Sequence, residues 1–450
     1  MLVTKRMALS GLDIYKLLPK TNCRECGFPT CLAFALSLAK KVVSLEKCPY
    51  VSEKAKEALE AQAQPPIRLV LVGDDKNRIE VGNETVMFRH EEKFHHPTAI
   101  GFIIEDSLTN EEIKQRLDKI TRLQFERVGQ LLKTDLIAIK QTRDAKRWLE
   151  AVNLISGLSG FGIVLISEDS SAQLAALESL AKKRPLIYAA TDKNILEFSR
   201  LAKEHNAPLA IRFKSMDDLS ELTKKAKEAG ACDIVIDLNT ERHNQEVLWE
   251  LTQVRRQALK KANRSLGYPV ITVMNRLNSY EEVIKAGDYI AKYSGIVLLN
   301  GFEEWAVLAL LTLRQNIYTD PQRPLQIESK LYPVGNTTEA SPVLVTTNFS
   351  LTYYTVLGEV EASKIASNIL SVNTEGMSVL TAWAAEKFTP DKIAESLKKS
   401  GVEEKVKHRN LIIPGYVAVM SGDLEEKSGW KIIVGPKEAA GIPSFLKNLG

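Results

Sequence analysis

The sequence predicts a multidomain α/β protein with a small helical N-terminal domain, a central (β/α)8 TIM barrel and a C-terminal Rossmann-like α/β domain. Three observations predict this class. At 450 residues the chain is too long for one ordinary core. Short apolar runs alternate with amphipathic stretches between residues 98 and 320. A similar alternation returns over residues 321–450, after a segment rich in proline.

The composition is that of an ordinary soluble globular protein, with 44% hydrophobic and 26% charged residues. The net charge of +4 is small for this length, which argues against a nucleic-acid-binding protein. No apolar run reaches the roughly 18–20 residues that cross a bilayer, so we expect no membrane association. Residues 1–20 lack the apolar centre of a signal peptide and predict a helix. A cytoplasmic protein is therefore expected.

The N-terminal domain, residues 1–57, is expected to hold a metal centre. Its cysteines are spaced as Cys23-x2-Cys26-x4-Cys31-x16-Cys48, and a proline follows the last one. A reducing cytoplasm argues against disulfides. Structural zinc sites usually show two C-x2-C pairs, whereas Cys48 stands alone. The pattern therefore favours a [4Fe–4S] cluster, with a zinc site or free thiols as the alternatives.

Residues 58–97 are expected to connect this domain to the barrel. Ser52 is predicted to cap a helix rich in Ala, Glu and Lys, because serine is a preferred N-cap residue. The segment 62–66 contains two prolines and indicates a stiff linker. Between residues 67 and 97 two apolar runs flank charged turns, which predicts a β-ribbon.

The barrel is predicted over residues 98–320 from apolar runs that suit strands buried on both faces of a parallel sheet. These runs lie at 98–106, 136–141, 162–167, 185–190, 208–213, 233–238, 269–274 and 295–300. The stretches between them predict helices, among them one over 110–132 and an eighth over 302–315. Cys232, the remaining cysteine, is predicted to be a buried thiol at a strand end.

A catalytic barrel would place its reactive groups at the carboxyl ends of these strands. The polar residues found there have no diagnostic spacing, and solvation of the barrel rim explains them. They are Glu105, Asp106, Lys140, Ser167, Glu168, Thr191, Asp192, Arg212, Lys214, Asp237, Asn275 and Arg276.

The C-terminal domain, residues 321–450, carries small, hydroxyl-rich turns after its predicted strands. In doubly wound sheets such turns lie at the carboxyl edge, where small residues let a planar ligand approach the backbone. We expect a ligand site there. Its candidate residues are Thr346, Thr347, Asn348, Thr352, Thr374, Glu375, Gly376, Met377, Ser378, Val379, Pro414, Gly415, Ala418, Gly435 and Ala440.

The motifs NCRECGFPTCLAFA, VTTNFSLTYY, NTEGMSVLTAWA and GWKIIVGPKEAAGIP, together with the barrel, resemble the large (gamma) subunit of the corrinoid iron–sulfur protein of the reductive acetyl-CoA pathway. The resemblance covers essentially the whole chain. It implies a [4Fe–4S] cluster on Cys23, Cys26, Cys31 and Cys48, and a cobamide in the C-terminal domain. The implied role is methyl-group carriage: Co(I) accepts a methyl group from methyltetrahydrofolate through a separate methyltransferase and passes it to acetyl-CoA synthase.

Many cobalamin domains carry a D-x-H-x-x-G motif whose histidine binds cobalt from below, and this chain has none. A base-off cobamide without a histidine lower ligand is therefore expected, because weak ligation favours reduction to Co(I). By its place in the NTEGMS turn, Thr374 is the candidate for the lower side of cobalt and the candidate catalytic residue. If Co(I) is accidentally oxidised to Co(II), the cluster would reduce it back to Co(I) with a low-potential electron.

The resemblance also implies partners. They are the small (delta) subunit as a heterodimer, the methyltetrahydrofolate methyltransferase, acetyl-CoA synthase, and a low-potential electron donor such as ferredoxin or a reductive activator. The barrel is then expected to be a scaffold without chemistry of its own, so an enzyme activity of the isolated chain stays open. Two alternatives remain: an iron–sulfur TIM-barrel folate methyltransferase, and a structural subunit of a redox complex.

Overall fold

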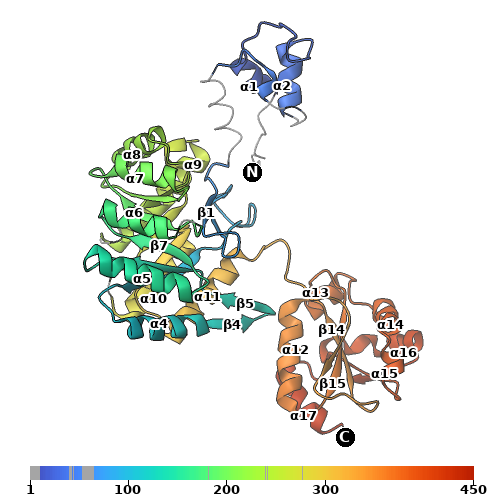
Figure 1. Cartoon of the computed structure of the whole chain (residues 1–450). Coiled ribbons are helices and arrows are strands. Elements are labelled where there is room, and N and C mark those ends of the chain that lie inside the picture. Colours follow the sequence, from blue (N-terminus) through green and yellow to red (C-terminus); the bar gives the residue numbers. More distant parts are fainter. Residues whose placement is uncertain are drawn as a thin grey trace. The chain divides into compact units, whose positions relative to one another are not determined.

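The computed structural model describes residues 11–39, 43, 45–52, 65–180, 182–238, 240, 242–275 and 277–449. These residues form two compact units (Figure 1). The first unit takes in the barrel, and the second consists of Phe88–Phe94, Leu123–Lys133 and Gln315–Gly450. The helix predicted after Ser52 and the first part of the predicted linker fall at 53–64, outside the described residues. No helix in the described part of the chain is long and apolar enough to cross a membrane.

The N-terminal segment consists of α1 (Gly11–Leu17), α2 (Cys31–Ala39) and the short helix η1 (Leu45–Lys47). The hydroxyl oxygen of Thr30 accepts a hydrogen bond of 3.1 Å from the Ala33 amide and so caps the start of α2. Apolar side chains from both helices, among them Ile14 and Phe34, form a small core of their own. Three of the cysteines share that core.

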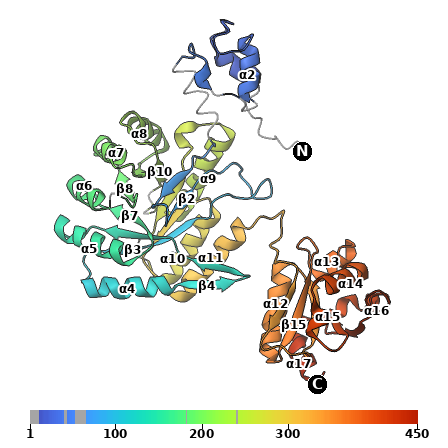
Figure 2. The same cartoon turned by 45° about the vertical axis from the view of Figure 1, so that its right-hand side comes forward.

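The eight predicted barrel strands are confirmed, and they form a closed barrel of parallel strands (Figure 2). The barrel closes where β12 pairs with β3, with Ile296 opposite Ala99. Nearly every strand residue is buried, as expected for strands covered on both faces. The strands are β3 (Ala99–Glu105), β6 (Leu136–Lys140), β7 (Gly162–Ile166), β8 (Leu186–Ala190), β9 (Leu209–Arg212), β10 (Ile234–Asp237), β11 (Val270–Val273) and β12 (Ile296–Leu299).

A ring of helices surrounds the strands (Figure 2). Short polar side chains at Asp144, Asp169, Ser215 and Asn278 accept hydrogen bonds from the first turns of the helices that follow them. The helices are α4 (Asn110–Arg122), α5 (Ala145–Leu158), α6 (Ser170–Ser179), α7 (Ile195–Glu204), α8 (Met216–Glu228), α9 (Asn244–Lys260), α10 (Ser279–Ala291) and α11 (Glu304–Tyr318), with the short η2 (Arg264–Leu266) after α9.

The prediction of one helix over 110–132 is wrong. Helix α4 ends at Arg122, and β4 (Gln124–Arg127) and β5 (Gln130–Lys133) form an antiparallel hairpin. The two loop residues Val128 and Gly129 both have positive φ, at 51° and 67°. This conformation gives the tight two-residue turn whose twist matches the flanking strands. The alternation of residues on either side of this turn therefore indicates two strands, although it also resembles the pattern of an amphipathic helix.

Cys232 also differs from its prediction. The thiol is exposed rather than buried, because β10 begins only at Ile234 and Cys232 lies in the loop before it. Its Sγ lies 3.6 Å from the Gly230 carbonyl oxygen.

A two-stranded antiparallel ribbon of β1 (Val70–Val72) and β2 (Ile79–Val81) packs against the barrel core. Val70, Val72 and Val81 are buried in the same apolar cluster as the inward-facing strand residues. A Cβ on Gly295, just before β12, would contact Val81. The ribbon therefore fills the amino end of the barrel.

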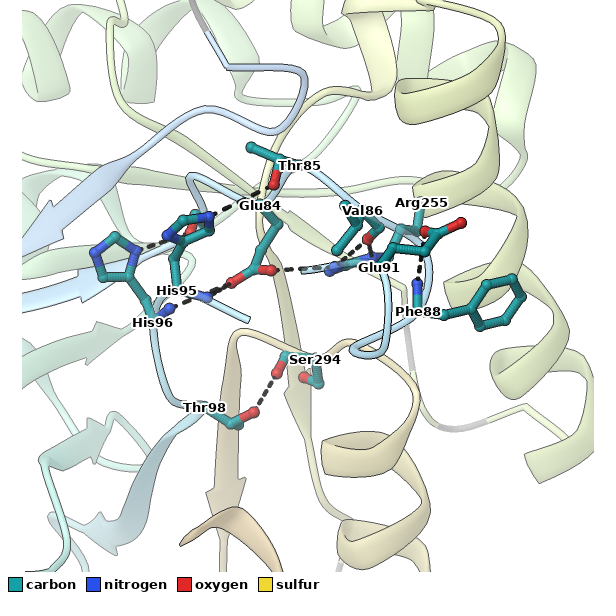
Figure 3. A network of polar contacts seen from close by, with 11 residues as sticks. Glu84, Thr85, Val86, Phe88, Glu91, His95, His96, Thr98, Arg255 and Ser294 are labelled. Atoms are coloured by element: carbon teal, nitrogen blue, oxygen red, sulfur yellow. Dashed lines mark hydrogen bonds and ion pairs between the residues drawn. The ribbon is translucent and has the colours of Figure 1, made fainter. Parts of the chain in front are cut away.

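Glu84 holds the segment that follows the ribbon in place (Figure 3). Its carboxylate accepts hydrogen bonds from the backbone amides of His95 and His96, at 2.9 and 3.2 Å. The guanidinium of Arg255 on α9 donates to Glu84 at 3.1 Å and, through Nε, to the Val86 carbonyl at 2.9 Å. Both charged side chains are almost fully buried, so water screens the attraction between their charges only weakly.

We expect Gly82→Ala to destabilise the barrel unit by roughly 2 kcal/mol or more, because Gly82 has φ +92° and its Cβ would clash with the Arg68 carbonyl oxygen. Gly157→Ala is the matched control. Gly157 lies in α5 with open space around it, so its substitution should leave stability unchanged or slightly raised. Chemical denaturation of both variants checks this, and equal stabilities would contradict the expectation.

The C-terminal sheet has the order β13-β15-β14-β16-β17, with β13 antiparallel to its neighbour and the other strands parallel. Figures 1 and 2 show α12 on one side of the sheet and α14–α16 on the other. The strands are β13 (Leu331–Val334), β14 (Val343–Thr347), β15 (Ser367–Val372), β16 (Asn410–Ile413) and β17 (Lys431–Val434). The helices are α12 (Ser350–Ser363), α13 (Val379–Ala384), α14 (Pro390–Lys399), α15 (Val402–Lys405), α16 (Ser421–Ser428) and α17 (Ile442–Lys447), with the short η3 (Gly415–Met420) and η4 (Ala439–Gly441).

Candidate functional site

The order of the C-terminal sheet reverses between β14 and β16. From β14 the chain passes through α12 to β15 on one side, and it returns through α13–α15 to β16 on the other. Connections that leave two neighbouring parallel strands toward opposite faces open a crevice at the carboxyl edge, which is where such sheets bind ligands. The predicted turns after β14, β15 and β16 all lie at this edge.

Asn348 joins the first two of these turns. Its side-chain oxygen accepts hydrogen bonds from the Thr374 amide at 2.9 Å, the Thr374 hydroxyl at 3.1 Å and the Gly376 amide at 3.1 Å. Its side-chain nitrogen donates to Gln326 at 3.1 Å. Glu375 and Gly376 both have positive φ, so the turn after β15 folds back tightly onto Asn348. One buried amide thus fixes the conformation of two loops.

The turns after β16 and β17 are joined in a second pair. The Gly415 amide donates to the Pro436 carbonyl at 3.0 Å. A Cβ on Gly415 would lie 2.6 Å from the Gly435 carbonyl oxygen, so only glycine permits this approach.

Three hydroxyl groups at the carboxyl edge are buried without a hydrogen-bond partner among the described residues: those of Thr346, Thr347 and Ser371. Thr346 and Ser371 are neighbours in register on β14 and β15, so their side chains share one face of the sheet. Thr347 points to the opposite face. An unpaired buried hydroxyl costs about 1–3 kcal/mol. Their concentration at this edge suits a ligand that brings polar groups to them.

Large apolar side chains are exposed in the elements that directly follow β14, β15 and β16. Val419 is 77% exposed and Trp383 is 42% exposed. We call these side chains the apolar rim, and such a rim at the edge that holds the buried hydroxyl groups fits a large planar ligand with polar substituents. The members of the rim are Leu351, Leu380, Trp383, Tyr416 and Val419.

The structure places the predicted site residues unequally. Thr374 is fully buried, and its hydroxyl also contacts the Met377 carbonyl oxygen at 3.0 Å. Glu375 is exposed and pairs with Lys387 at 2.6 Å, a hydrogen bond that lowers the pKa of the Glu375 carboxyl. Ala440 is exposed on η4, after the last strand. Partly exposed positions at the edge are Thr352, Met377, Ser378, Val379, Pro414, Ala418 and Gly435.

Sequence reasoning missed Ser371 and the whole apolar rim. A serine inside the strand SNILSV is a detectable signal, because the neighbouring strand positions are apolar. The rim residues looked like ordinary core positions of amphipathic helices, since their exposure depends on where each helix begins relative to the sheet.

The four cysteines of the N-terminal segment are all free. Cys31 and Cys48 are buried, and Cys26 packs against the same apolar core, whereas Cys23 is exposed. The Asn22 amide donates to Cys31 Sγ at 3.4 Å, and the Asn22 side-chain oxygen accepts from the Cys31 amide at 2.8 Å. This reciprocal pair fixes one cysteine against the loop that carries two others.

The donor set has the chemistry of an iron–sulfur site, because four cysteine thiolates are the usual ligands of such clusters. No three His, Cys, Asp or Glu side chains in the described residues converge closely enough to hold a metal ion. Binding a cluster would therefore require the four cysteines to close in from the positions that they occupy here. Gly27 has φ +84° and open space where a Cβ would stand, so the loop between Cys26 and Cys31 leaves room for that closure.

The Tyr50 hydroxyl lies beside the exposed cysteine. It donates to the Glu25 carboxylate at 2.8 Å. That hydrogen bond, followed by the charge of Glu25, raises the pKa of Tyr50, and the charge of Cys23 adds to the effect.

At the carboxyl end of the barrel, several of the predicted rim residues are buried rather than solvated, among them Asp106, Ser167 and Asp237. Asp237 is 1% exposed and accepts hydrogen bonds from Arg212 Nε at 2.7 Å and the Tyr188 hydroxyl at 2.6 Å. Arg212 also donates to the Tyr188 oxygen at 2.5 Å, which closes the network. Burial, followed by the charge of Asp237, raises the pKa of Tyr188 well above its usual value. Arg276 lies outside the described residues.

A closed parallel barrel, a doubly wound sheet with unpartnered buried hydroxyls among the described residues of its carboxyl edge, and a segment of four free cysteines define a multidomain α/β protein with two separate candidate sites. Residues 69–446 match the family described as CO dehydrogenase/acetyl-CoA synthase delta subunit. Residues 18–50 match a family described as a putative Fe-S cluster.

Full-length relatives extend these matches. The corrinoid/iron–sulfur protein large subunit of Moorella thermoacetica is 46% identical over 442 residues, covering 98% of this chain and 99% of the relative. Acetyl-CoA decarbonylase/synthase complex subunit gamma is 34% identical in Methanothermobacter thermautotrophicus, covering 98% and 99% of the two chains. In Archaeoglobus fulgidus it is 35% identical, covering 97% and 98%.

The chain belongs to the family of corrinoid/iron–sulfur protein large subunits and acetyl-CoA decarbonylase/synthase gamma subunits, which confirms the resemblance seen in the sequence. The family match over 69–446 carries the name of a delta subunit. The full-length relatives are the better guide, because their alignments also include the cysteine segment. Among solved structures, the dihydropteroate synthase of Vibrio fischeri aligns with 50% of this chain at a TM-score of 0.39 and 15% identity, which says nothing about chemistry.

Proposed function

We propose that this chain is a methyl-group carrier of the reductive acetyl-CoA pathway, with a corrinoid in the C-terminal crevice and an iron–sulfur cluster on the N-terminal cysteines. The observation that carries the proposal is the set of buried hydroxyls without a described partner at Thr346, Thr347 and Ser371, at the same sheet edge as an exposed apolar rim. The names of the relatives, which mention a corrinoid, an iron–sulfur protein and acetyl-CoA decarbonylase/synthase, support it.

The residues at the crevice would hold the corrinoid in two ways. The hydroxyls of Thr346 and Ser371 on one face of the sheet, and that of Thr347 on the other, could donate to amide oxygens of the ring, while Trp383 and Val419 would cover its apolar surface. A bound corrinoid would supply a cobalt centre that takes up and releases the methyl group. The role of the protein is then to bind the ring, to keep water from the reactive side and to present it to partners.

A base-off corrinoid without a histidine ligand is part of the proposal. No histidine of the described residues lies in the turns at the crevice. His408 is the histidine of the C-terminal sheet, and it precedes β16 at the opposite edge, with Nε2 3.0 Å from the Ser341 carbonyl oxygen. Thr374 is proposed as the residue that faces the lower side of cobalt. Its hydroxyl is already engaged by Asn348 and Met377, which keeps it a weak donor.

The remaining segments have supporting roles in the proposal. Residues 1–57 would supply the electrons that reactivate the cobalt by reduction, and residues 58–97 would connect this domain to the barrel. Residues 98–320 would serve as a scaffold, and residues 321–450 would carry the corrinoid. The polar groups of Tyr188, Arg212 and Asp237 at the barrel mouth are hydrogen-bonded to one another, which supports a barrel without its own chemistry. The proposed partners are the small subunit, the methyltetrahydrofolate methyltransferase, acetyl-CoA synthase and a low-potential electron donor, in the cytoplasm.

Anaerobic purification with iron and cobalt analysis and a visible spectrum tests the proposal directly. A corrinoid spectrum with about one cobalt and about four irons per chain supports it. Iron without cobalt, in protein produced with corrinoid available, would contradict a carrier and leave a redox subunit.

A double substitution, Thr346→Val with Thr347→Val, separates ligand binding from folding. The apo protein should be as stable as the wild type or more stable, because two unpaired buried hydroxyls are replaced by methyl groups. The corrinoid should bind about 10-fold more weakly, the equivalent of about 1.4 kcal/mol. Thr355→Val on α12 is the matched control, since its hydroxyl donates to the Leu351 carbonyl at 2.8 Å on the exposed surface. Equal corrinoid affinity in all three proteins would exclude these hydroxyls as contacts.

A further inference from the structure

Helix α11 differs from a typical outer helix of a barrel. Its sequence, EWAVLALLTLRQNIY, contains charged residues only at Glu304 and Arg314. Val307, Leu310 and Leu311 face the barrel and are fully buried, yet Trp305 and Leu308 on the outer side are 45% and 38% exposed. A helix that is apolar on every side is normally covered on every side.

Helix α10 continues the same apolar surface. Tyr280 and Ile284, one turn apart, are 72% and 65% exposed. The Tyr280 and Trp305 rings lie 5.0 Å apart between centroids. Gly287 of α10 faces α11, since a Cβ there would lie 3.5 Å from a methyl group of Leu313, an ordinary van der Waals contact. We call the surface formed by Tyr280, Ile284, Trp305 and Leu308 the α10–α11 face.

Acidic side chains predominate beside this face, although Lys285 directly follows Ile284 in α10. Glu281, Glu303 and Glu304 are exposed in or just before the first turns of the two helices, next to the aromatic pair. Glu303 accepts a hydrogen bond from the Ser279 hydroxyl at 2.6 Å, so its carboxylate is fixed at this end of the face. A complementary surface needs an apolar centre and Lys or Arg at the matching edge. A second copy of this chain would bring like charges together around a two-fold axis, which disfavours self-association.

From this geometry we propose that the α10–α11 face is a docking surface for another subunit of the complex, one whose own contact surface is apolar in the centre and basic at the edge. The inference rests on the proposed function, which makes this chain one subunit of an assembly. Aromatic residues surrounded by charged ones are typical of the central contacts in such interfaces. The four side chains account for the apolar surface that this helix pair leaves exposed.

The test measures the affinity of the full-length, cofactor-loaded chain for the small subunit of the same complex by isothermal titration calorimetry. Trp305→Glu and Ile284→Glu should each weaken binding about 30-fold or more, because a carboxylate would be buried at the centre of the contact. Glu281→Lys should weaken binding less and reduce its salt dependence. Leu158→Glu on α5, at a side chain that is 57% exposed in the wild type, is the matched control and should bind normally.

Unchanged affinity in both Trp305→Glu and Ile284→Glu would overturn the inference. So would a wild-type dimer in sedimentation experiments that Trp305→Glu dissociates, since the occupant would then be a second copy. The inference would also fail if the C-terminal unit of the same chain covered this face. In that case the Trp305→Glu chain would be more expanded than the wild type and would bind the small subunit with normal affinity. Iron and cobalt contents report separately on the proposed function, and they should be equal in all these variants.

Discussion

Replacing Cys48 with serine is expected to abolish assembly of the iron–sulfur cluster, with iron falling from about four atoms per chain to below one. Cys48 is buried in the N-terminal core beside Cys31, and a serine hydroxyl is a poor ligand for iron in such clusters. Cobalt content should stay unchanged, because the corrinoid would sit in a different compact unit. Iron analysis and the visible spectrum of anaerobically purified protein measure both.

Cys232→Ser is the matched control for this experiment. Its thiol is free and exposed in the barrel unit, far in sequence from the other four. The Cys232→Ser protein should keep the full iron content. A wild-type level of iron in Cys48→Ser, or an equal loss in both variants, would show that the N-terminal cysteines are not the ligands.

Arg255→Met is expected to destabilise the barrel unit by about 3–5 kcal/mol. The substitution keeps an unbranched apolar stem but leaves Glu84 buried without its cationic partner, at a position where the two side chains are 4% and 9% exposed. Two hydrogen-bond donors to the Val86 carbonyl also disappear. Urea unfolding followed by circular dichroism should show the loss in its first transition.

Lys225→Met provides the comparison for a surface pair. Lys225 contacts Glu221 at 2.6 Å on α8, but both side chains are about half exposed or more, so the loss should be below about 1 kcal/mol. If Arg255→Met lowers the free energy of unfolding no more than Lys225→Met does, then Glu84 must find other partners. The buried network of Figure 3 would then not be what holds this segment in place.

The barrel was predictable because each strand is a short apolar run that stays buried on both faces, and that signal survives without any alignment. The hairpin at 124–133 was not, since its alternating residues also fit the periodicity of an amphipathic helix over a few turns. What decided between them was a two-residue turn, Val128-Gly129, in which a β-branched residue takes positive φ against its usual preference.

For the candidate site, the hydroxyl-rich turns were predictable from composition alone, because small polar residues after strands mark the carboxyl edge of such sheets. The burial of Thr346 without a partner and the exposure of Trp383 could not be predicted. Both depend on where α12 and α13 begin relative to the strand ends, which is a property of tertiary packing. The aromatic pair Tyr280–Trp305 escaped notice for the same reason.

The ribbon of β1 and β2 has a consequence for how the chain can be divided. Val70, Val72 and Val81 fill one end of the barrel. The boundary of the independently folding domain therefore lies before the ribbon and not at the first barrel strand. A chain shortened to begin at Pro65 keeps the β1–β2 ribbon and should fold as an independent unit. One trimmed to begin at Thr98 exposes an uncapped apolar interior to water and is expected to aggregate.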